Sequence, residues 1–522
     1  MDSKGDERSQ PAVNGSDLIV LRRFVQNTAI SAVAYALAGV LGLFAVGVIA
    51  RSYGVAVLGL IVLARTFLPT GIFALIDFGV SESTTQFVAR GRVGDWAVAS
   101  EKVSLLTTIA AVTGVFAAIG LWISAALLTA IFKVAPDQAD VFVAILRVTA
   151  PLLPITFLGL VAEGALKGFE QYGWLRLTEV GGNALYVVAV YALVWQGAPF
   201  EMIAYSYLAM TVAKYLVLAG VLYRAVQATP LRFRSWTASS RRDVLHRCWL
   251  MFNNRLAGVF QQTLVPLAIG ALYSPAAVGT YDLITRLPRF LKATMAPLHS
   301  AILPLSTYIE ESSDTRRLQI LGRNGLVLPT AVVVPVLVVV ALFSEQILKV
   351  WVGPQHAGEW PWLALSMFIP AFTVMLGAGQ TALMVRSDFL RLNTKLLYLQ
   401  VAVQYLVTAL ALVWFRERAF ILGWVVSYVV FAPVTAHRVL SYMNLPASLF
   451  WEQVGKHALV ATILAVVITA GKMFLDPGSL VALMIAGGFS CILAWALSGA
   501  IILSGSDRAM FGRFAKAMTR HS

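Results

Sequence analysis

The chain has 522 residues, of which 59% are hydrophobic and 13% are charged, and its mean hydropathy is +0.77. This composition excludes a soluble domain of the same length and is typical of a protein that lies in the lipid bilayer. The net charge of +14 would suggest a nucleic-acid partner in a soluble protein. Most Lys and Arg residues stand in short connectors between apolar runs, so we expect no nucleic-acid partner.

Apolar runs recur along the whole chain, and each is long enough for a helix across ~30 Å of hydrocarbon. We therefore predict an all-α fold, a polytopic membrane helix bundle of about 14 transmembrane helices. The first run is too long for a signal-peptide core, so we expect it to be retained. The spans are predicted near 24–49, 56–80, 103–132, 141–166, 174–195, 201–223, 248–272, 279–304, 326–350, 360–385, 392–415, 419–441, 457–475 and 479–503.

Basic residues in the connectors indicate the orientation of the bundle. With the N-terminus in the cytoplasm, the inside segments hold roughly 27 Lys and Arg and the outside loops about 7. Both termini are therefore predicted to be cytoplasmic. The longest inside connector is rich in arginine and is expected to lie along the anionic inner leaflet, as is the basic tail after residue 503.

The chain repeats itself weakly about 220 residues apart, with the same residue types leading into an Arg-bearing span. The matching positions are Tyr53, Ala56, Gly59 and Leu63 in the first copy and Tyr273, Ala276, Gly279 and Leu283 in the second. The repeat predicts two pseudo-symmetric six-helix lobes followed by two extra helices. The predicted parts are a cytoplasmic segment 1–23, an N-lobe 24–226, a basic linker 227–247, a C-lobe 248–443, extra helices 444–503 and a basic cytoplasmic tail 504–522.

Six basic side chains fall inside the apolar runs, and these are the candidate substrate-binding residues. At the centre of a membrane helix each would cost roughly 2.5 to 3.5 kcal/mol, so water, partner charges or an anionic ligand must compensate them. A cationic, water-accessible cavity that takes a phosphate-bearing substrate explains the whole set. The six residues are Arg65, Lys214, Arg255, Arg286, Arg289 and Lys292.

The strongest pattern among them is a stripe on the eighth span. Asp282, Arg286 and Arg289 stand at i, i+4 and i+7 and share one helix face. An internal Asp282–Arg286 pair that only neutralises charge is the alternative, but it leaves Arg289 and Lys292 without partners. Arg65 has no acidic residue within four positions, and its depth in the run argues against reaching the interface.

The remaining basic candidates have equally good packing explanations. Arg255 shares a face with Gln262, and that face either binds sugar hydroxyls and phosphate oxygens or joins helices. Lys214 shares a face with Tyr207 and lies either in the cavity or between packed helices.

Four acidic residues in or near the spans are candidates for ion coupling, since a carboxylate at low dielectric can exchange a proton or bind a cation. They are Asp77, Glu163, Glu179 and Asp282. Each has a simpler explanation: Glu163 can pair with Lys167, Asp282 with Arg286, and Asp77 can cap a helix break before Gly79. The fifth span carries a polar face made of Glu179, Asn183 and Tyr186. This face either contacts a sugar or makes hydrogen bonds to another helix.

Signatures of enzymes and cofactors are missing from the sequence. There is no Walker loop, HExxH or CxxC motif, and Cys248 and Cys491 make no metal-ligand spacing. We therefore expect no catalytic residue, no cofactor and no metal.

Short motifs at the start of each lobe resemble a known transporter family. The stretch Ile49 to Gly54, then Gly59 and Asp77-Phe78-Gly79, resembles the first two helices of polysaccharide transporter (Wzx-type) flippases of the MOP superfamily, which also contains MATE transporters and lipid II flippases. Val278 to Tyr281 is similar to the corresponding signature of the second lobe.

The resemblance implies a V-shaped pair of lobes that moves an undecaprenyl-diphosphate-linked oligosaccharide across the bacterial inner membrane by alternating access. The product would be O-antigen, exopolysaccharide or capsule, with a polysaccharide polymerase and export machinery as further candidate partners. One alternative is a cation-coupled drug exporter of the same fold, although an acidic cavity would be expected there. A second is a membrane polysaccharide polymerase or ligase, which would place catalytic residues in a long outside loop.

Overall fold

The computed structural model describes residues 15–69, 71–227, 229–295, 315–474 and 477–508, together with the single positions 302, 306 and 309. Every regular element in this part of the chain is a helix. Eleven stretches among the described residues are long and apolar enough to cross a membrane, and one of them, Ser387–Tyr442, joins two successive helices. The fold class is therefore confirmed, and the number of 14 spans stays a prediction.

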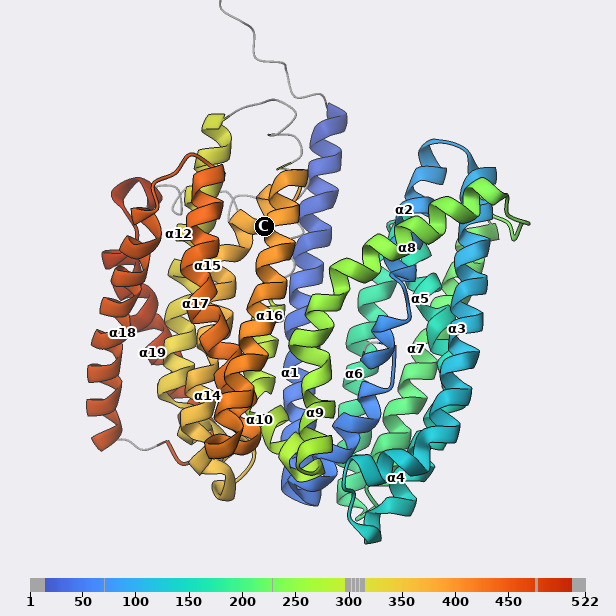
Figure 1. Cartoon of the computed structure of the whole chain (residues 1–522). Coiled ribbons are helices and arrows are strands. Elements are labelled where there is room, and N and C mark those ends of the chain that lie inside the picture. The colour runs from blue at the N-terminus through green and yellow to red at the C-terminus, as the bar shows by residue number, and fades with distance from the viewer. Residues whose placement is uncertain are drawn as a thin grey trace, which may run out of the picture.

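The helices form two groups with α1 between them (Figure 1). Helix α1 packs against α6 in the first group and against α10 in the second, so it joins the two groups. The first group consists of α1 (Gly15–Thr66), α2 (Val80–Val93), α3 (Trp96–Ile131), α4 (Pro136–Thr149), α5 (Leu153–Gly168), α6 (Tyr172–Trp195) and α7 (Glu201–Gln227). We call α2 to α7 the N-lobe helices.

The second group begins after the basic linker. It comprises α8 (Ala238–Gly258), α9 (Leu264–Leu272), α10 (Pro275–Ala293), α12 (Thr315–Leu342), α13 (Ser344–Trp351), α14 (Trp360–Ser366), α15 (Phe368–Leu383), α16 (Ser387–Phe415) and α17 (Ala419–Tyr442). Helices α18 (Ser448–Phe474) and α19 (Leu480–Ile501) follow at the outer side of this group (Figure 1). We call the end of the bundle at which α1 begins the upper end, and the opposite end the lower end.

Two predicted spans are interrupted halfway through the bundle. The chain turns at Gly54, where φ is +84°, and the following helical segment stops at Thr66. Residues 67–69 and 71–79 are irregular apart from a short 3-10 turn, so the prediction of one continuous helix over 56–80 was wrong. Pro69 lacks a backbone N–H and favours this break. In the span predicted over 248–272, a π-helical turn at Val259–Thr263 separates α8 from α9.

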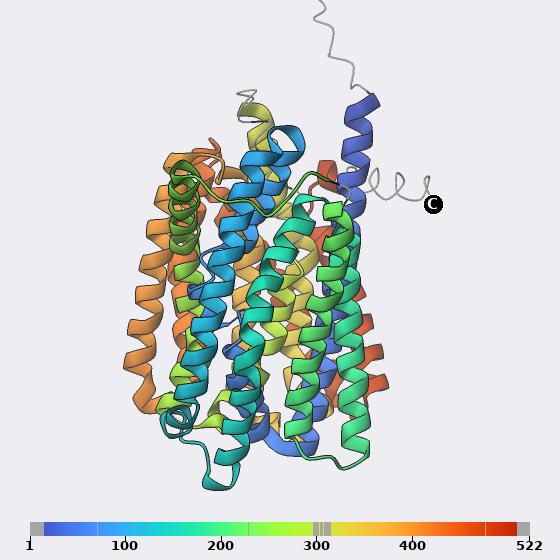
Figure 2. The ribbon, with the colours of Figure 1, turned by 90° about the vertical axis from the view of Figure 1, so that its right-hand side faces the viewer.

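The basic linker lies across the upper end of the N-lobe helices (Figure 2). Its backbone is tied to α3: the N–H of Arg232 donates to Ser100 Oγ at 3.2 Å, and the N–H of Arg234 donates to Ser104 Oγ at 2.9 Å. Both serines are buried. Glu101 accepts hydrogen bonds from the hydroxyls of Thr237 and Ser240 where α8 begins. The linker is therefore an ordered strap that is fixed to one lobe.

Reciprocal glycine contacts join α1 and α10 at the lower end of the bundle. A Cβ atom at Gly59 would overlap the carbonyl oxygen of Pro275, and one at Gly279 would overlap the carbonyl oxygen of Val55. These positions correspond in the internal repeat, so each copy packs its glycine on the backbone of the other. Lys133, between α3 and α4, adds a bridge by donating to the carbonyl oxygen of Leu272 at 2.6 Å.

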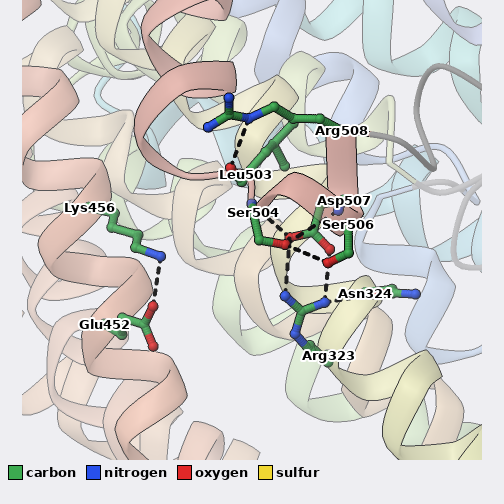
Figure 3. A network of polar contacts seen from close by, with 9 residues as sticks. All are labelled: Arg323, Asn324, Glu452, Lys456, Leu503, Ser504, Ser506, Asp507 and Arg508. Atoms are coloured by element: carbon green, nitrogen blue, oxygen red, sulfur yellow. Dashed lines mark hydrogen bonds and ion pairs between the residues drawn. The ribbon is translucent and has the colours of Figure 1, made fainter.

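The end of α19 is anchored to α12 by a buried carboxylate (Figure 3). Asp507 is 3% exposed and accepts hydrogen bonds from Nη1 and Nη2 of Arg323 at 2.8 and 3.1 Å. The hydroxyl of Ser504 also donates to Asp507, at 2.6 Å. Nearby on α18, Lys456 pairs with Glu452 at 2.7 Å, and the carboxylate of this pair is 55% exposed.

Asp507→Ala is expected to lower the stability of the purified protein by about 1 to 3 kcal/mol, at the low end because Arg323 is 40% exposed. The Arg323 hydrogen bonds hold the pKa of Asp507 down at about 2, below the ≈ 3.9 of an unfolded Asp. The Asp507–Arg323 pair therefore contributes its full stability at a pH above the pKa of the unfolded Asp, and this stability is lost as the pH falls toward 2. Thermal unfolding at pH 7 and near pH 2 measures both effects.

The matched control is Glu452→Ala, which removes the exposed pair and should change stability by less than about 1 kcal/mol. Equal melting temperatures for Asp507→Ala and Glu452→Ala would show that the Arg323–Asp507 contact does not hold the segment.

Candidate functional site

The stripe predicted on the eighth span forms a charge cluster on α10. Asp282 is 1% exposed and pairs with both arginines of the stripe. Its Oδ2 lies 3.4 Å from Nη1 of Arg286, and its Oδ1 accepts a hydrogen bond from Arg289. The predicted Asp282–Arg286 pair exists, but it does not neutralise the positive charge of the stripe, because one carboxylate pairs with two guanidinium groups.

Arg65 completes the cluster from α1. It stands in the last helical turn before the irregular segment, where the exposed carbonyl groups of a helix end favour a cation. The guanidinium carbon of Arg65 lies 3.9 Å from the ring centroid of Tyr207 on α7, a cation–π contact. Within the described residues, no carboxylate lies at ion-pair distance from Arg65. The sequence alone offered no signal for the contact with Tyr207.

Two cavities meet at the three arginines. A cavity of about 360 Å³ lies between α1, α6 and α10, and another of about 230 Å³ lies toward the π-helical turn. Arg65, Arg286 and Arg289 line both cavities, and Asp282 lines the second. Three guanidinium groups and the Asp282 carboxylate leave a formal charge of +2 at the junction, since Glu179, which also lines the first cavity, is neutralised by Arg176. We call this place the arginine junction. Such a site suits a multiply charged oxyanion.

The other predicted basic residues lie apart from this junction. Lys214 donates to Glu163 at 2.6 Å, and Lys292 donates to the hydroxyl of Tyr428 on α17 at 3.0 Å. Neither lysine lines the two cavities that contain the arginines. Hydropathy reports depth in the membrane and does not report which helix face meets which, so it could not show this separation. Substrate binding by the two lysines stays a prediction. The side chain of Arg255 lies outside the described residues.

The four acidic candidates occupy different surroundings. Asp77 is buried, and its Oδ1 accepts a hydrogen bond from the N–H of Gly79 at 2.8 Å, so it caps the helix break. Glu163 pairs across helices with Lys214 and not with Lys167, the alternative partner on its own helix. Glu179 pairs with Arg176 at 2.6 Å and lines the 360 Å³ cavity. Asp282 alone of the four contacts the arginines of the junction. Coupling by any of them stays a prediction.

Comparisons with known proteins agree with the helical fold described above. Residues 48–360 match a family model described as polysaccharide biosynthesis protein. No curated protein sequence matches the chain. Among solved structures, the chain is similar to the lipid II flippase MurJ in an inward closed conformation, with a TM-score of 0.68, 13% identity, and coverage of 91% of this chain and 98% of that chain.

Two further structures show the same fold. An outward-facing multidrug resistance MATE transporter of the MOP superfamily gives a TM-score of 0.57 at 15% identity, covering 80% of this chain and 95% of that chain. A MATE protein in complex with MaL6 also gives 0.57 at 15% identity, with coverage of 81% and 96%.

Proposed function

The chain belongs to the family of polysaccharide biosynthesis proteins, since the family model covers more than half of it, and from this premise we propose that it is a lipid-linked oligosaccharide flippase. It carries undecaprenyl-diphosphate-linked repeat units across the inner membrane by alternating access, for O-antigen, exopolysaccharide or capsule. It has no catalytic residue. Both termini are cytoplasmic in this proposal, so the upper end faces the cytoplasm and the lower end faces outward.

The observation that carries the proposal is the arginine junction inside the bundle. A diphosphate loses its hydration when it enters the membrane, and guanidinium groups replace that hydration with paired N–H donors. Arg65 comes from one repeat, and Arg286 and Arg289 come from the other. A diphosphate at the junction would therefore contact both repeats, which is the position that alternating access requires of a substrate.

The contacts at the lower end support the same mechanism. Reciprocal contacts between Gly59 and Pro275 and between Val55 and Gly279 hold the two repeats together beyond the junction. In the proposed cycle these contacts separate when the loaded protein opens outward. A substrate can drive this change only if it binds the two states with different affinity.

The charge of the junction argues against the two rival functions. An organic cation of the kind that drug exporters carry would meet a formal charge of +2, which repels it. A polymerase or ligase would need an activated nucleophile or a general base at the reacting bond. Each carboxylate at the junction already pairs with arginine: Asp282 with Arg286 and Arg289, and Glu179 with Arg176.

Reconstitution into liposomes tests the proposed function. Vesicles containing the protein and a fluorescent undecaprenyl-diphosphate trisaccharide are treated from outside with a glycosidase that cannot cross the membrane. The protein should raise the cleaved fraction from about half to nearly all of the lipid. Cleavage that stays near half in protein-containing vesicles, together with uptake of an organic cation such as ethidium, would favour the drug exporter instead.

A further inference from the structure

A third cavity opens within the N-lobe beside the arginine junction. It has a volume of about 170 Å³ and lies between the irregular segment after Arg65 and helices α5, α6 and α7. We call it the N-lobe pocket. Glu179, Asn183 and Tyr186 line both this pocket and the 360 Å³ cavity that contains the arginines. A ligand held at the junction could therefore extend directly into the N-lobe pocket.

The charged groups of the N-lobe pocket neutralise one another. Lys214 pairs with Glu163 at 2.6 Å, and Glu179 pairs with Arg176 at the same distance. The pocket therefore has no excess positive charge, in contrast to the junction beside it. It does not resemble a second phosphate site, and a carboxylate-bearing ligand would gain no additional ion pair there.

Uncharged hydrogen-bonding groups and aromatic rings make up much of the remaining wall. Tyr186 is 5% exposed, and its hydroxyl is buried with no hydrogen-bond partner among the described residues. A buried hydroxyl without a partner costs about 1 to 3 kcal/mol, which a ligand hydroxyl would offset. The ring of Tyr186 packs edge-to-face on that of Tyr207, with centroids 5.4 Å apart. The other polar lining residues are Thr156, Thr178, Asn183, Thr211 and Tyr215.

The threonine hydroxyl groups in the wall can still accept hydrogen bonds from a ligand. Thr211 Oγ1 donates to the carbonyl oxygen of Tyr207 at 2.9 Å, and Thr178 Oγ1 donates to that of Trp174 at 3.0 Å. Each hydroxyl oxygen still has lone pairs for a ligand O–H. The pocket thus combines acceptors, one unsatisfied donor and aromatic surface, which together recognise a polyhydroxylated ring.

We propose that the N-lobe pocket receives the sugar ring attached to the diphosphate and that it selects an uncharged pyranose, such as a hexose or an N-acetylhexosamine. This inference rests on the proposed function, because the arginine junction must hold the diphosphate. The volume supports one ring: 170 Å³ is below the ≈ 300 to 1,000 Å³ of pockets that enclose drug-sized ligands. The sugar is bonded directly to the diphosphate, so its site must adjoin the arginines, as this pocket does.

Binding measurements with two defined lipids test the inference. Purified protein in nanodiscs is titrated with undecaprenyl diphosphate and with undecaprenyl-diphosphate N-acetylglucosamine, and both dissociation constants are measured by native mass spectrometry. The sugar should tighten binding about tenfold, which corresponds to one or two good hydrogen bonds. Tyr186→Phe and Asn183→Leu should each remove most of this gain. Thr178→Val and Thr211→Val, at positions that line the N-lobe pocket and not the cavity of the arginines, should reduce the gain and leave the affinity for undecaprenyl diphosphate unchanged.

A matched control is Tyr223→Phe, which removes a hydroxyl from helix α7, packed against α6, at a position that is 65% exposed. It should bind both lipids as the wild type does. A third lipid that carries glucuronic acid in place of the neutral sugar should gain less than the N-acetylglucosamine lipid. An equal or larger gain with glucuronic acid would overturn the preference for an uncharged ring.

Failure of this inference is distinguishable from failure of the proposed function. If wild type binds neither lipid, the function is wrong. If wild type binds both lipids and the sugar gain survives in Tyr186→Phe and Asn183→Leu, the diphosphate site stands and the N-lobe pocket is not the sugar site. Melting temperatures within a degree or two of wild type show that a lost gain does not come from unfolding.

Discussion

Arg65→Ala should abolish export of the polysaccharide while the protein remains inserted and abundant. Arg65 contributes one of the three guanidinium groups of the arginine junction, and a hydrogen bond to a charged group contributes about 1.5 to 3 kcal/mol. Its loss should weaken binding of undecaprenyl diphosphate roughly 10- to 150-fold. The double variant Arg286→Ala/Arg289→Ala should have at least as large an effect. Binding in nanodiscs and flipping in liposomes measure the two consequences separately.

Arg147→Ala is the matched control for charge removal. Arg147 is exposed on α4 and lies 5.8 Å from the ring of Trp122, away from the cavities that contain Arg65. This variant should transport normally. Arg65→Lys should rescue transport only partly, since a lysine keeps the charge and loses the two-pronged grip on phosphate oxygens. Full rescue by lysine would show that charge alone matters, and normal export by Arg65→Ala would remove Arg65 from the site.

Asp282→Asn changes the charge of the same junction in the opposite direction. Removing this carboxylate raises the formal charge from +2 to +3 and releases two arginines from their shared partner. Diphosphate binding should become tighter, and release should become slower. The expected pattern is a lower dissociation constant with a lower flipping rate, which a general loss of folding would not produce.

Gly59→Val should abolish transport, because the valine side chain forces α1 and α10 apart at the lower end. The atom that a side chain at Gly59 meets is a backbone carbonyl oxygen, that of Pro275, so no side-chain rotation relieves the overlap. Overpacking of this kind typically costs 1 to 3 kcal/mol, enough to shift an equilibrium between closed and open states roughly 5- to 150-fold. Gly279→Val should behave alike, because it meets the carbonyl oxygen of Val55.

The accessibility of the cavity from outside measures this shift. A single cysteine at Gln262, which lines the 230 Å³ cavity, is labelled in intact cells with an impermeant maleimide, in a background without Cys248 and Cys491. Labelling should rise several-fold in Gly59→Val. Gly120→Val is the control, since a Cβ at Gly120 meets nothing within 4 Å. Wild-type transport and unchanged labelling in Gly59→Val would show that these contacts are not a gate.

Sequence patterns predicted the parts of the site that depend on neighbours along one helix. The spacing of Asp282, Arg286 and Arg289 placed them on one face of α10, and the structure confirms the shared contact. The weak repeat paired Gly59 with Gly279, and these glycines lie in equivalent contacts. In both cases the information is local, because helix periodicity alone determines which side chains stand together.

The amino-acid sequence by itself determined that this is an all-helical membrane protein with positive charge buried at depth, since apolar length and uncompensated arginine are readable from residue order alone. The tertiary structure decided which of these charges remain available to bind a ligand. Lys214 meets Glu163 from 51 positions away, and Arg65 meets Tyr207 on another helix. Hydropathy reports how deep a residue lies, whereas helix packing sets its partner. Three of the six predicted basic residues therefore share one junction, and two lie elsewhere.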